Sequence, residues 1–147
     1  MSSEVHAVTI KGVMPTSNGC AIFLGPMDKT FMIYVDPHIG NAIAMIINQE
    51  TPERPLTHDL LSNILVGLGA QLERSVINAV KDRTFYARII IKMQNELGTK
   101  IVEIDARPSD AIAMALHDQK PIFVSEQVLE AEEDKTELLE RIQSDQG

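Results

Sequence analysis

One stretch, residues 100–114, constrains the fold of this chain more than any other. It reads Lys-Ile-Val-Glu-Ile-Asp-Ala-Arg-Pro-Ser-Asp-Ala-Ile-Ala-Met. Apolar and acidic residues alternate from Val102 to Ala106, as expected of a strand with one buried face. Pro108 ends strand pairing and suits the first turn of a helix, where Ser109 and Asp110 are typical capping residues. The stretch therefore predicts a strand that leads directly into a helix.

This junction concentrates polar side chains, and two interpretations of them remain open. In the first, they form a functional site; in the second, they are architectural. The architectural interpretation has Ser109 and Asp110 cap the helix while Arg107 pairs with Asp105. Caps are routine and contribute about 1 kcal/mol each. The residues at issue are Asp105, Arg107, Ser109 and Asp110.

A second stretch repeats the first without a gap. Residues 36–45 read Asp-Pro-His-Ile-Gly-Asn-Ala-Ile-Ala-Met, against Asp-Ala-Arg-Pro-Ser-Asp-Ala-Ile-Ala-Met at 105–114. An apolar run precedes both, so we interpret the pair as a degenerate structural duplication. It predicts strand-ending aspartates at Asp36 and Asp105, and Asn41 and Asp110 in the opening turns of helices.

Periodicity along the rest of the chain predicts the order β-β-β-α-α-β-β-β-α-β-α. The expected fold class is α/β, an α+β mixed sheet made of two degenerate β-β-β-α units. A helix capped by Thr57 is inserted between the units, with an apolar stripe from Leu60 to Leu68 as its core face. A C-terminal helix is expected over residues 126–143. We expect a domain over residues 1–125, followed by an acidic helix and tail over residues 126–147.

The charge is unevenly distributed. The chain carries 21 acidic and 13 basic side chains, and residues 126–147 alone hold 8 and 2 of them. The body is thus nearly neutral. Its one basic concentration lies at residues 72–93, whose hairpin could touch phosphates weakly and without sequence preference, or could simply be a solvated sheet face. The basic residues are Arg74, Lys81, Arg83, Arg88 and Lys92.

Several function classes receive no support from the sequence. The lone Cys20 fits a reducing compartment, and the first residues show no secretory signal. No apolar run approaches the roughly 20 residues that span a bilayer. We therefore expect a soluble, cytoplasmic protein with no membrane partner. No glycine loop for phosphates, no zinc spacing and no nucleophile elbow is present, so no organic cofactor is expected.

We also expect a homo-oligomer, in the first place a dimer. Two three-stranded units leave sheet edges that need covering, because unpaired edges invite pairing with another chain.

A further motif opens the inserted helix. Residues 54–59 read Arg-Pro-Leu-Thr-His-Asp and echo the Arg-Pro of the central junction. His58 and Asp59 could supply a base and a carboxylate, or Asp59 could ligate a hard metal ion through oxygen. They could equally be capping residues.

Four segments, in matching order, together resemble the bifunctional nuclease family, a bacterial and plant group also described as a domain of unknown function. They are Arg-Pro-Leu-Thr-His-Asp-Leu-Leu (54–61), Thr-Phe-Tyr-Ala (84–87), Asp-Ala-Arg-Pro-Ser-Asp-Ala-Ile (105–112) and Pro-Ile-Phe-Val (121–124). The resemblance covers residues 5–129. It implies DNase and RNase activity by phosphodiester hydrolysis, assisted by a divalent metal such as Mg²⁺ or Mn²⁺.

The resemblance also implies roles for individual residues. Arg54, Arg107, Thr57 and Ser109 would bind substrate, the two arginines by holding phosphate. Asp59, Asp105 and Asp110 would hold the metal, and His58 would activate water. The implied catalytic set is His58, Asp59, Asp105 and Asp110.

One departure from the family pattern affects this site. Many relatives carry Gly and Glu where this chain has Asp36 and Ile39, so that carboxylate is either lost or replaced by Asp36. The alternative to a nuclease is a non-enzymatic interaction or structural module, in which the Arg-Pro motifs only build Arg–carboxylate pairs.

Overall fold

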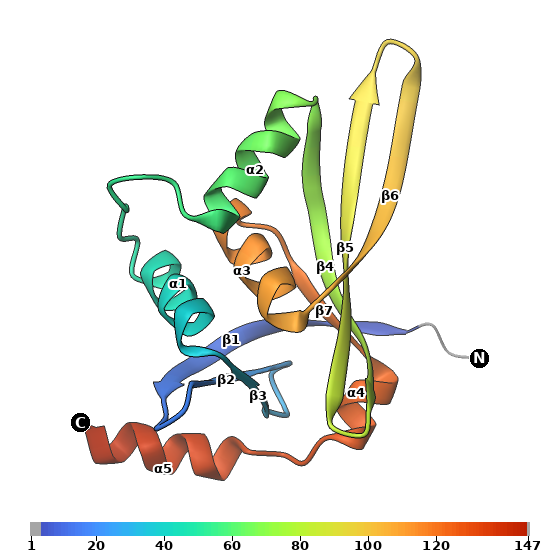
Figure 1. Cartoon of the computed structure of the whole chain (residues 1–147). Helices are drawn as coiled ribbons and strands as arrows, with labels where there is room; N and C mark the ends of the chain where they lie inside the picture. Colours follow the sequence, from blue (N-terminus) through green and yellow to red (C-terminus); the bar gives the residue numbers. More distant parts are fainter. Residues whose placement is uncertain (1–3, 147) are drawn as a thin grey trace.

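The computed structural model describes residues 4–146 (Figure 1). Within that range the strands are β1 (Val5–Pro15), β2 (Cys20–Gly25), β3 (Phe31–Val35), β4 (Ala70–Lys81), β5 (Thr84–Asn95), β6 (Gly98–Ala106) and β7 (Ile122–Ser125). The helices are α1 (Pro37–Ile47), α2 (Thr57–Gly67), α3 (Pro108–Asp118), α4 (Glu126–Ala131) and α5 (Thr136–Gln146).

The seven strands form one mixed sheet in the order β3-β2-β1-β7-β4-β5-β6. Strand β7 lies at the centre, antiparallel to β1 and parallel to β4, and every other neighbouring pair is antiparallel. The units β1-β2-β3 and β4-β5-β6 therefore flank β7 in mirrored order. This architecture confirms the predicted class, a mixed α/β fold with two β-β-β-α units and an inserted helix.

Both copies of the repeated sequence lie at strand-to-helix junctions, from β3 into α1 and from β6 into α3. The placement differs by two residues from the gapless match, however. Helix α1 begins directly after Asp36, whose Oδ1 accepts a hydrogen bond from the Ile39 N–H at 3.0 Å. Helix α3 begins only at Pro108. The expectation for Asn41 is thus wrong: it lies in the second turn of its helix, because the Asp36 cap starts α1 early.

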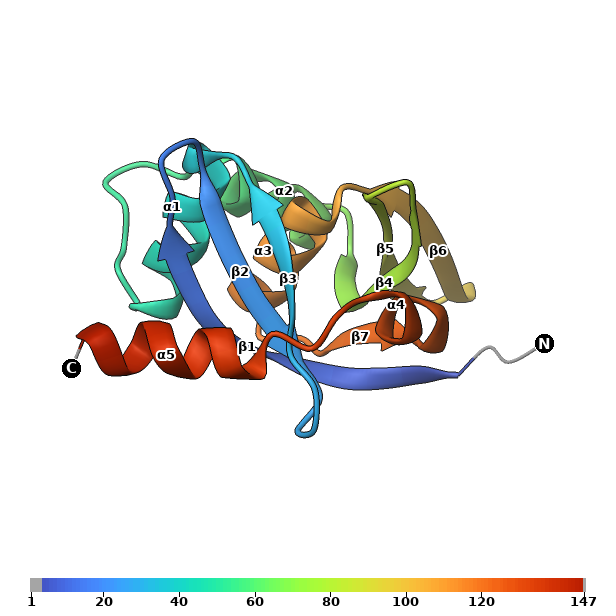
Figure 2. The ribbon, with the colours of Figure 1, turned by 90° about the horizontal axis from the view of Figure 1, so that it is seen from below.

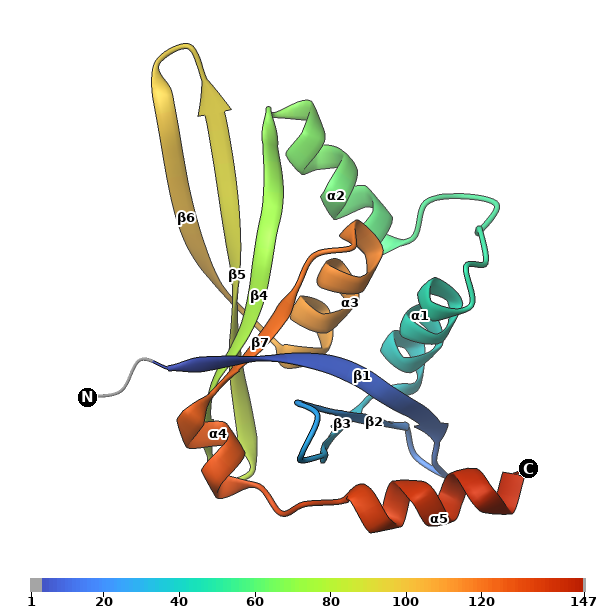
Figure 3. The same cartoon turned by 180° about the vertical axis from the view of Figure 1, so that it is seen from behind.

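Strand β2 is buried along its whole length because helices cover both of its faces. Cys20, Ile22 and Leu24 face the main core with α1, and the alternate residues Ala21 and Phe23 pack with Leu139 of α5. Figure 2 shows α5 beside β1 and β2. Residues of β7 and α3 belong to the same main core. Helix α3 lies between α1 and β4 (Figures 1 and 3).

The C-terminal segment forms two helices rather than the single helix expected over residues 126–143. The break is held by a tertiary contact with the turn before β3. The Thr30 N–H donates to Asp134 Oδ1 at 3.1 Å, and the Lys135 N–H donates to the Thr30 carbonyl at 2.6 Å. Asp134 then accepts the Thr136 N–H at the start of α5. Helix α4 inserts Val128 into the main core.

Helix α2 is oriented differently from the expectation. Its apolar stripe is largely exposed, whereas His58 and Ser62 are buried. The reason is that α2 contacts the polar edge of α3 as well as β4, so its polar side chains face inward. The exposed apolar side chains are Leu60, Leu61, Ile64, Val66 and Leu68. None of the helices in residues 4–146 combines the length and apolar character needed to cross a bilayer.

Candidate active site

The junction between β6 and α3 builds an arginine–aspartate pair. Arg107 has extended backbone and precedes Pro108, the first residue of α3, which places Asp110 in the opening turn. The Arg107 Nε donates to Asp110 Oδ2 at 2.8 Å, and its Nη2 donates to Oδ1 at 3.2 Å. Such bidentate contacts fix both side chains. The expected pairing of Arg107 with Asp105 is thus replaced by pairing within the helix start.

Helix α2 brings His58 to the same carboxylate. The His58 side chain is buried, and its Nε2 lies 3.2 Å from Asp110 Oδ1. Asp110 therefore joins α2 to α3, although 52 residues separate the two partners.

The electrostatics of this group favour an ionised Asp110. Burial acts to raise the pKa of Asp110, but the hydrogen bonds and positive charge of Arg107 and His58 act the other way and leave the pKa lowered. The pKa of Arg107 is raised, first by its hydrogen bond to Asp110. Asp110 is a carboxylate near neutral pH, so it accepts the hydrogen bond from Nε2 of His58, and Nδ1 is the ring nitrogen not used in that bond.

Asp36, from the matching segment at residues 36–45, also reaches this group. While capping α1 through Oδ1, it lies with Oδ2 4.0 Å from Arg107 Nη1. Arg107 thus lies between Asp36 and Asp110, one aspartate from each of the two matching segments. Ile39, at the position where many relatives carry Glu, is buried in the main core and supplies no carboxylate.

A second histidine–aspartate group lies beside the first and was missed by sequence reasoning. His117 Nε2 is 2.7 Å from Asp59 Oδ1, and His117 Nδ1 is 2.7 Å from Asp118 Oδ1. The Ser62 hydroxyl donates to Asp118 Oδ1 at 2.7 Å. The available signal was helical spacing, because residues 58 and 62 share one face of α2 while residues 110 and 117 share one face of α3.

Asp59 also explains where α2 begins. Its Oδ2 accepts the Leu56 N–H at 2.7 Å, so Leu56 is the N-cap and Thr57 is the first helical residue. The expectation that Thr57 caps the helix is therefore wrong: the carboxylate three residues along satisfies the terminal N–H instead.

Two adjoining hollows open beside His58, which lines both. The larger, about 630 Å³, is bounded by α1, α2 and the start of α3, and includes Thr57, Arg107 and Asp110. The smaller, about 280 Å³, includes Asp59 and His117. We call these two hollows together the His58 cleft. It is open to solvent at Arg107, whose side chain is 65% exposed.

Three predicted residues lie elsewhere. Arg54 is exposed in the loop before α2 and lines neither hollow. Asp105 lies exposed on β6 opposite Arg88 of β5, also outside the cleft. Ser109 is buried at the start of α3, beside a separate hollow shared with Asp36 and Arg107.

The three carboxylates expected to hold a metal do not fit that role together. Asp59 is engaged by His117 and the Leu56 N–H, and Asp110 by Arg107 and His58. Across residues 4–146, the group of three ligating side chains with atoms within 4.8 Å of one another is Glu4, His6 and Glu126, not Asp59, Asp105 and Asp110. We therefore assign no step of chemistry in the cleft to an ion held by those aspartates.

Fold and cleft define a mixed α/β protein with an Arg–Asp–His group at a helix junction. The family model described as the bifunctional nuclease domain matches residues 23–137, and this chain belongs to that family. It is 35% identical over 102 residues to two proteins of Mycobacterium tuberculosis, uncharacterized protein MT1877 of strain CDC 1551 / Oshkosh and uncharacterized protein Rv1829 of strain H37Rv. The alignments cover 69% of this chain and 58% of each relative, so the chain spans less than two thirds of their length.

Proposed function

We propose that this protein hydrolyses phosphodiester bonds of single-stranded nucleic acid in the His58 cleft. The observation that carries the proposal is the shared carboxylate of Asp110, which holds a buried histidine and an exposed arginine at one open hollow. Membership of the bifunctional nuclease family supports the reaction class.

The chemistry assigns a distinct task to each residue. Arg107 offers its exposed guanidinium to a phosphate oxygen and stabilises the negative charge that grows there as the bond to water forms. His58 takes the proton from the attacking water as a general base, and returns it to the ester oxygen that leaves as the P–O ester bond breaks. Asp110 orients the imidazole and stabilises the imidazolium that results. Asp36, 4.0 Å from Arg107, helps to position the guanidinium.

Substrate attraction should be weak. The chain carries a net charge of −8, which opposes binding of a polyanion. Exposed cations on the β4–β5 hairpin, among them Arg83 and Arg88, are the positive charges outside the cleft that a polyanion could contact. Because binding rests on a few phosphate contacts, affinity should fall steeply with salt.

The test is a nuclease assay on purified full chain with single-stranded DNA and RNA, run with and without a chelator. His58→Ala and Asp110→Asn should each lower the rate about 100-fold or more, the scale of losing a general base or its partner. Asp110→Asn retains a capping side chain, so it separates chemistry from helix initiation. His6→Gln, far from the cleft in sequence and lining neither hollow, is the histidine control and should keep wild-type activity.

The alternative function is an interaction module, favoured by one observation: the Arg107–Asp110 pair closes within a single helix turn, as an architectural pair would. In that case both cleft variants would unfold the protein or lose cooperativity in circular dichroism melts. Folded variants with undiminished activity would equally reject the cleft as the catalytic centre.

A further inference from the structure

A second cluster of titratable side chains lies where the N-terminal end of β1 meets α4. Strands β1 and β7 pair with Val5 opposite Ser125 and His6 opposite Val124. The same register sets Glu4 opposite Glu126, and the Glu126 N–H donates to the Glu4 carbonyl at 3.2 Å. This backbone hydrogen bond holds the two acidic residues opposite each other at the end of the β1–β7 ladder.

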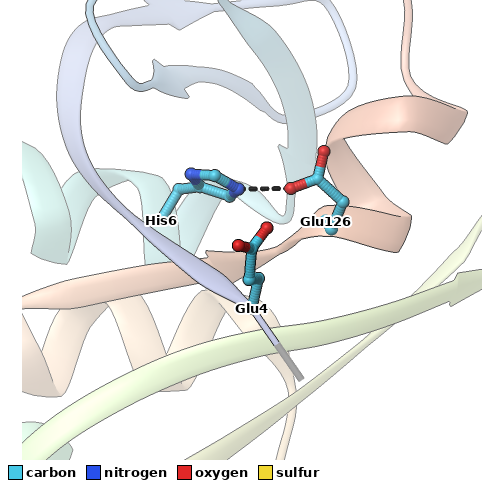
Figure 4. Close-up of side chains that lie close together, drawn as sticks. All are labelled: Glu4, His6 and Glu126. Atoms are coloured by element: carbon cyan, nitrogen blue, oxygen red, sulfur yellow. Dashed lines mark hydrogen bonds and ion pairs between the residues drawn. The ribbon is translucent and has the colours of Figure 1, made fainter. Parts of the chain in front are cut away.

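The three side chains of the cluster converge. Glu4 and His6 are two residues apart in extended chain, so they point to the same side. His6 Nε2 lies 2.5 Å from Glu126 Oε2, and Figure 4 shows the Glu4 carboxylate turned toward both. One ligating atom from each of the three lies within 4.8 Å of the others.

The surroundings are acidic. Asp28 and Glu130 line a hollow of about 280 Å³ that opens beside His6 and Glu126. The nearby cation, Lys29, donates its Nζ to the Leu129 carbonyl. The carboxylates of Glu4, Asp28, Glu126 and Glu130 therefore place negative charge around His6. The cluster thus attracts positive charge.

We propose that Glu4, His6 and Glu126 form a binding site for a divalent transition-metal ion of the Zn²⁺ type. One imidazole nitrogen and two carboxylate oxygens match the donors that Zn²⁺ accepts, at ligand distances of about 2.0–2.2 Å. Such distances place neighbouring ligands roughly 3–4 Å apart, which small side-chain rotations reach from the present spacing.

A simple ion pair is the competing explanation, and it accounts for less of the geometry. An exposed histidine–glutamate pair uses one carboxylate and contributes little to stability. It does not account for the convergence of one ligating atom from each of Glu4, His6 and Glu126 within 4.8 Å of one another. A divalent ion would accept a donor atom from all three side chains.

The site is independent of the proposed nuclease. Its ligands line neither hollow of the His58 cleft. They come from residue 4, from β1 and from α4, segments about 120 residues apart. A bound ion would tie the N-terminal end of β1 to α4, and three protein ligands leave positions on the ion open to water.

Calorimetric titration of the full chain with Zn²⁺ tests the proposal, using His6→Gln and Glu126→Gln. Wild type should bind one Zn²⁺ saturably at this site, and each variant should lose affinity by about 100-fold or more, because even outer-shell changes cost 10–100-fold. His38→Gln, an exposed histidine of α1, is the matched control and should bind as wild type does. Circular dichroism of the metal-free variants checks that the fold is retained.

Nitrogen-detected NMR of the histidine rings locates the ion directly. The ring-nitrogen shifts of His6 should move on adding Zn²⁺, and those of His58 should stay. The proposal is overturned if both variants keep wild-type affinity, if the shifts move only at other histidines, or if wild type shows no saturable binding at millimolar Zn²⁺.

Discussion

At the residue scale, Asp110 holds the cleft together. It accepts hydrogen bonds from Arg107, three residues before it, and from His58, which belongs to another helix. Both partners stabilise its ionised form, so the lowered pKa couples the cleft to the stability of the folded chain.

This coupling predicts how stability depends on pH. The folded-state pKa of Asp110 lies below its unfolded value of about 3.9. Its contribution is therefore fully present above about pH 4 and is lost as the pH falls through the lower, folded-state pKa. Asp110→Asn should remove about 1 kcal/mol at neutral pH, the scale of a partly exposed pair.

Urea unfolding between neutral pH and pH 2 measures the free energy of unfolding of wild type and of the variants. As the pH is lowered, the free energy of unfolding should decrease less steeply in Asp110→Asn than in wild type. We call this decrease the acid limb. Arg107→Gln should flatten it in part, because it removes one of the two partners. An unchanged acid limb in both variants would contradict the assignment.

At the element scale, two helical glycines differ in the space available for a side chain. Helix α1 crosses β2 so closely that a Cβ at Gly40 would lie 2.5 Å from the Cys20 Cβ and 3.0 Å from its Sγ. At Gly67, the last residue of α2, an added Cβ would meet nothing within 4 Å.

Gly40→Ala should therefore destabilise the protein by about 1–3 kcal/mol, as overpacking does. Gly67→Ala should stabilise it by about 0.4–1 kcal/mol, since alanine restricts the unfolded chain without strain. Chemical denaturation of the two variants beside wild type is the measurement. Equal effects at both positions would show that α1 does not approach β2 as described.

At the scale of the whole molecule, apolar surface on α2 and the open sheet edges point to self-association. Strands β3 and β6 each pair on one side only within residues 4–146. Val66 of α2 is 72% exposed, Leu68 directly after α2 is 66% exposed, and Ile101 of β6 is 51% exposed. Exposed apolar side chains gathered on one helix favour an interface.

We predict a homodimer that covers α2. Ile64→Lys, on the exposed face of α2, should shift the protein to monomer, while Met27→Lys, on the exposed β2–β3 turn, should leave the dimer intact. Light scattering at micromolar concentrations reads out the mass. A wild-type monomer at those concentrations would refute the prediction.

The sequence by itself determined the order of the elements through β7, because alternation, helical spacing and proline positions are local signals. It also placed Asp36 and Arg107 at strand-to-helix junctions, and it marked His58 and Asp110 as candidates. The family resemblance, confirmed for residues 23–137, followed from the same motifs.

Tertiary structure decided the partners. Asp110 joined His58 of another helix rather than a metal-binding trio with Asp59 and Asp105, and Asp59 paired with His117 instead. It also decided which face of α2 is buried, and it broke the C-terminal helix at Asp134 through Thr30. These outcomes depend on contacts between residues from about 50 to more than 100 positions apart, and local patterns carry no information about such distances. The sequence determines the chemistry of each side chain, but the packing of the elements determines which partner that side chain contacts.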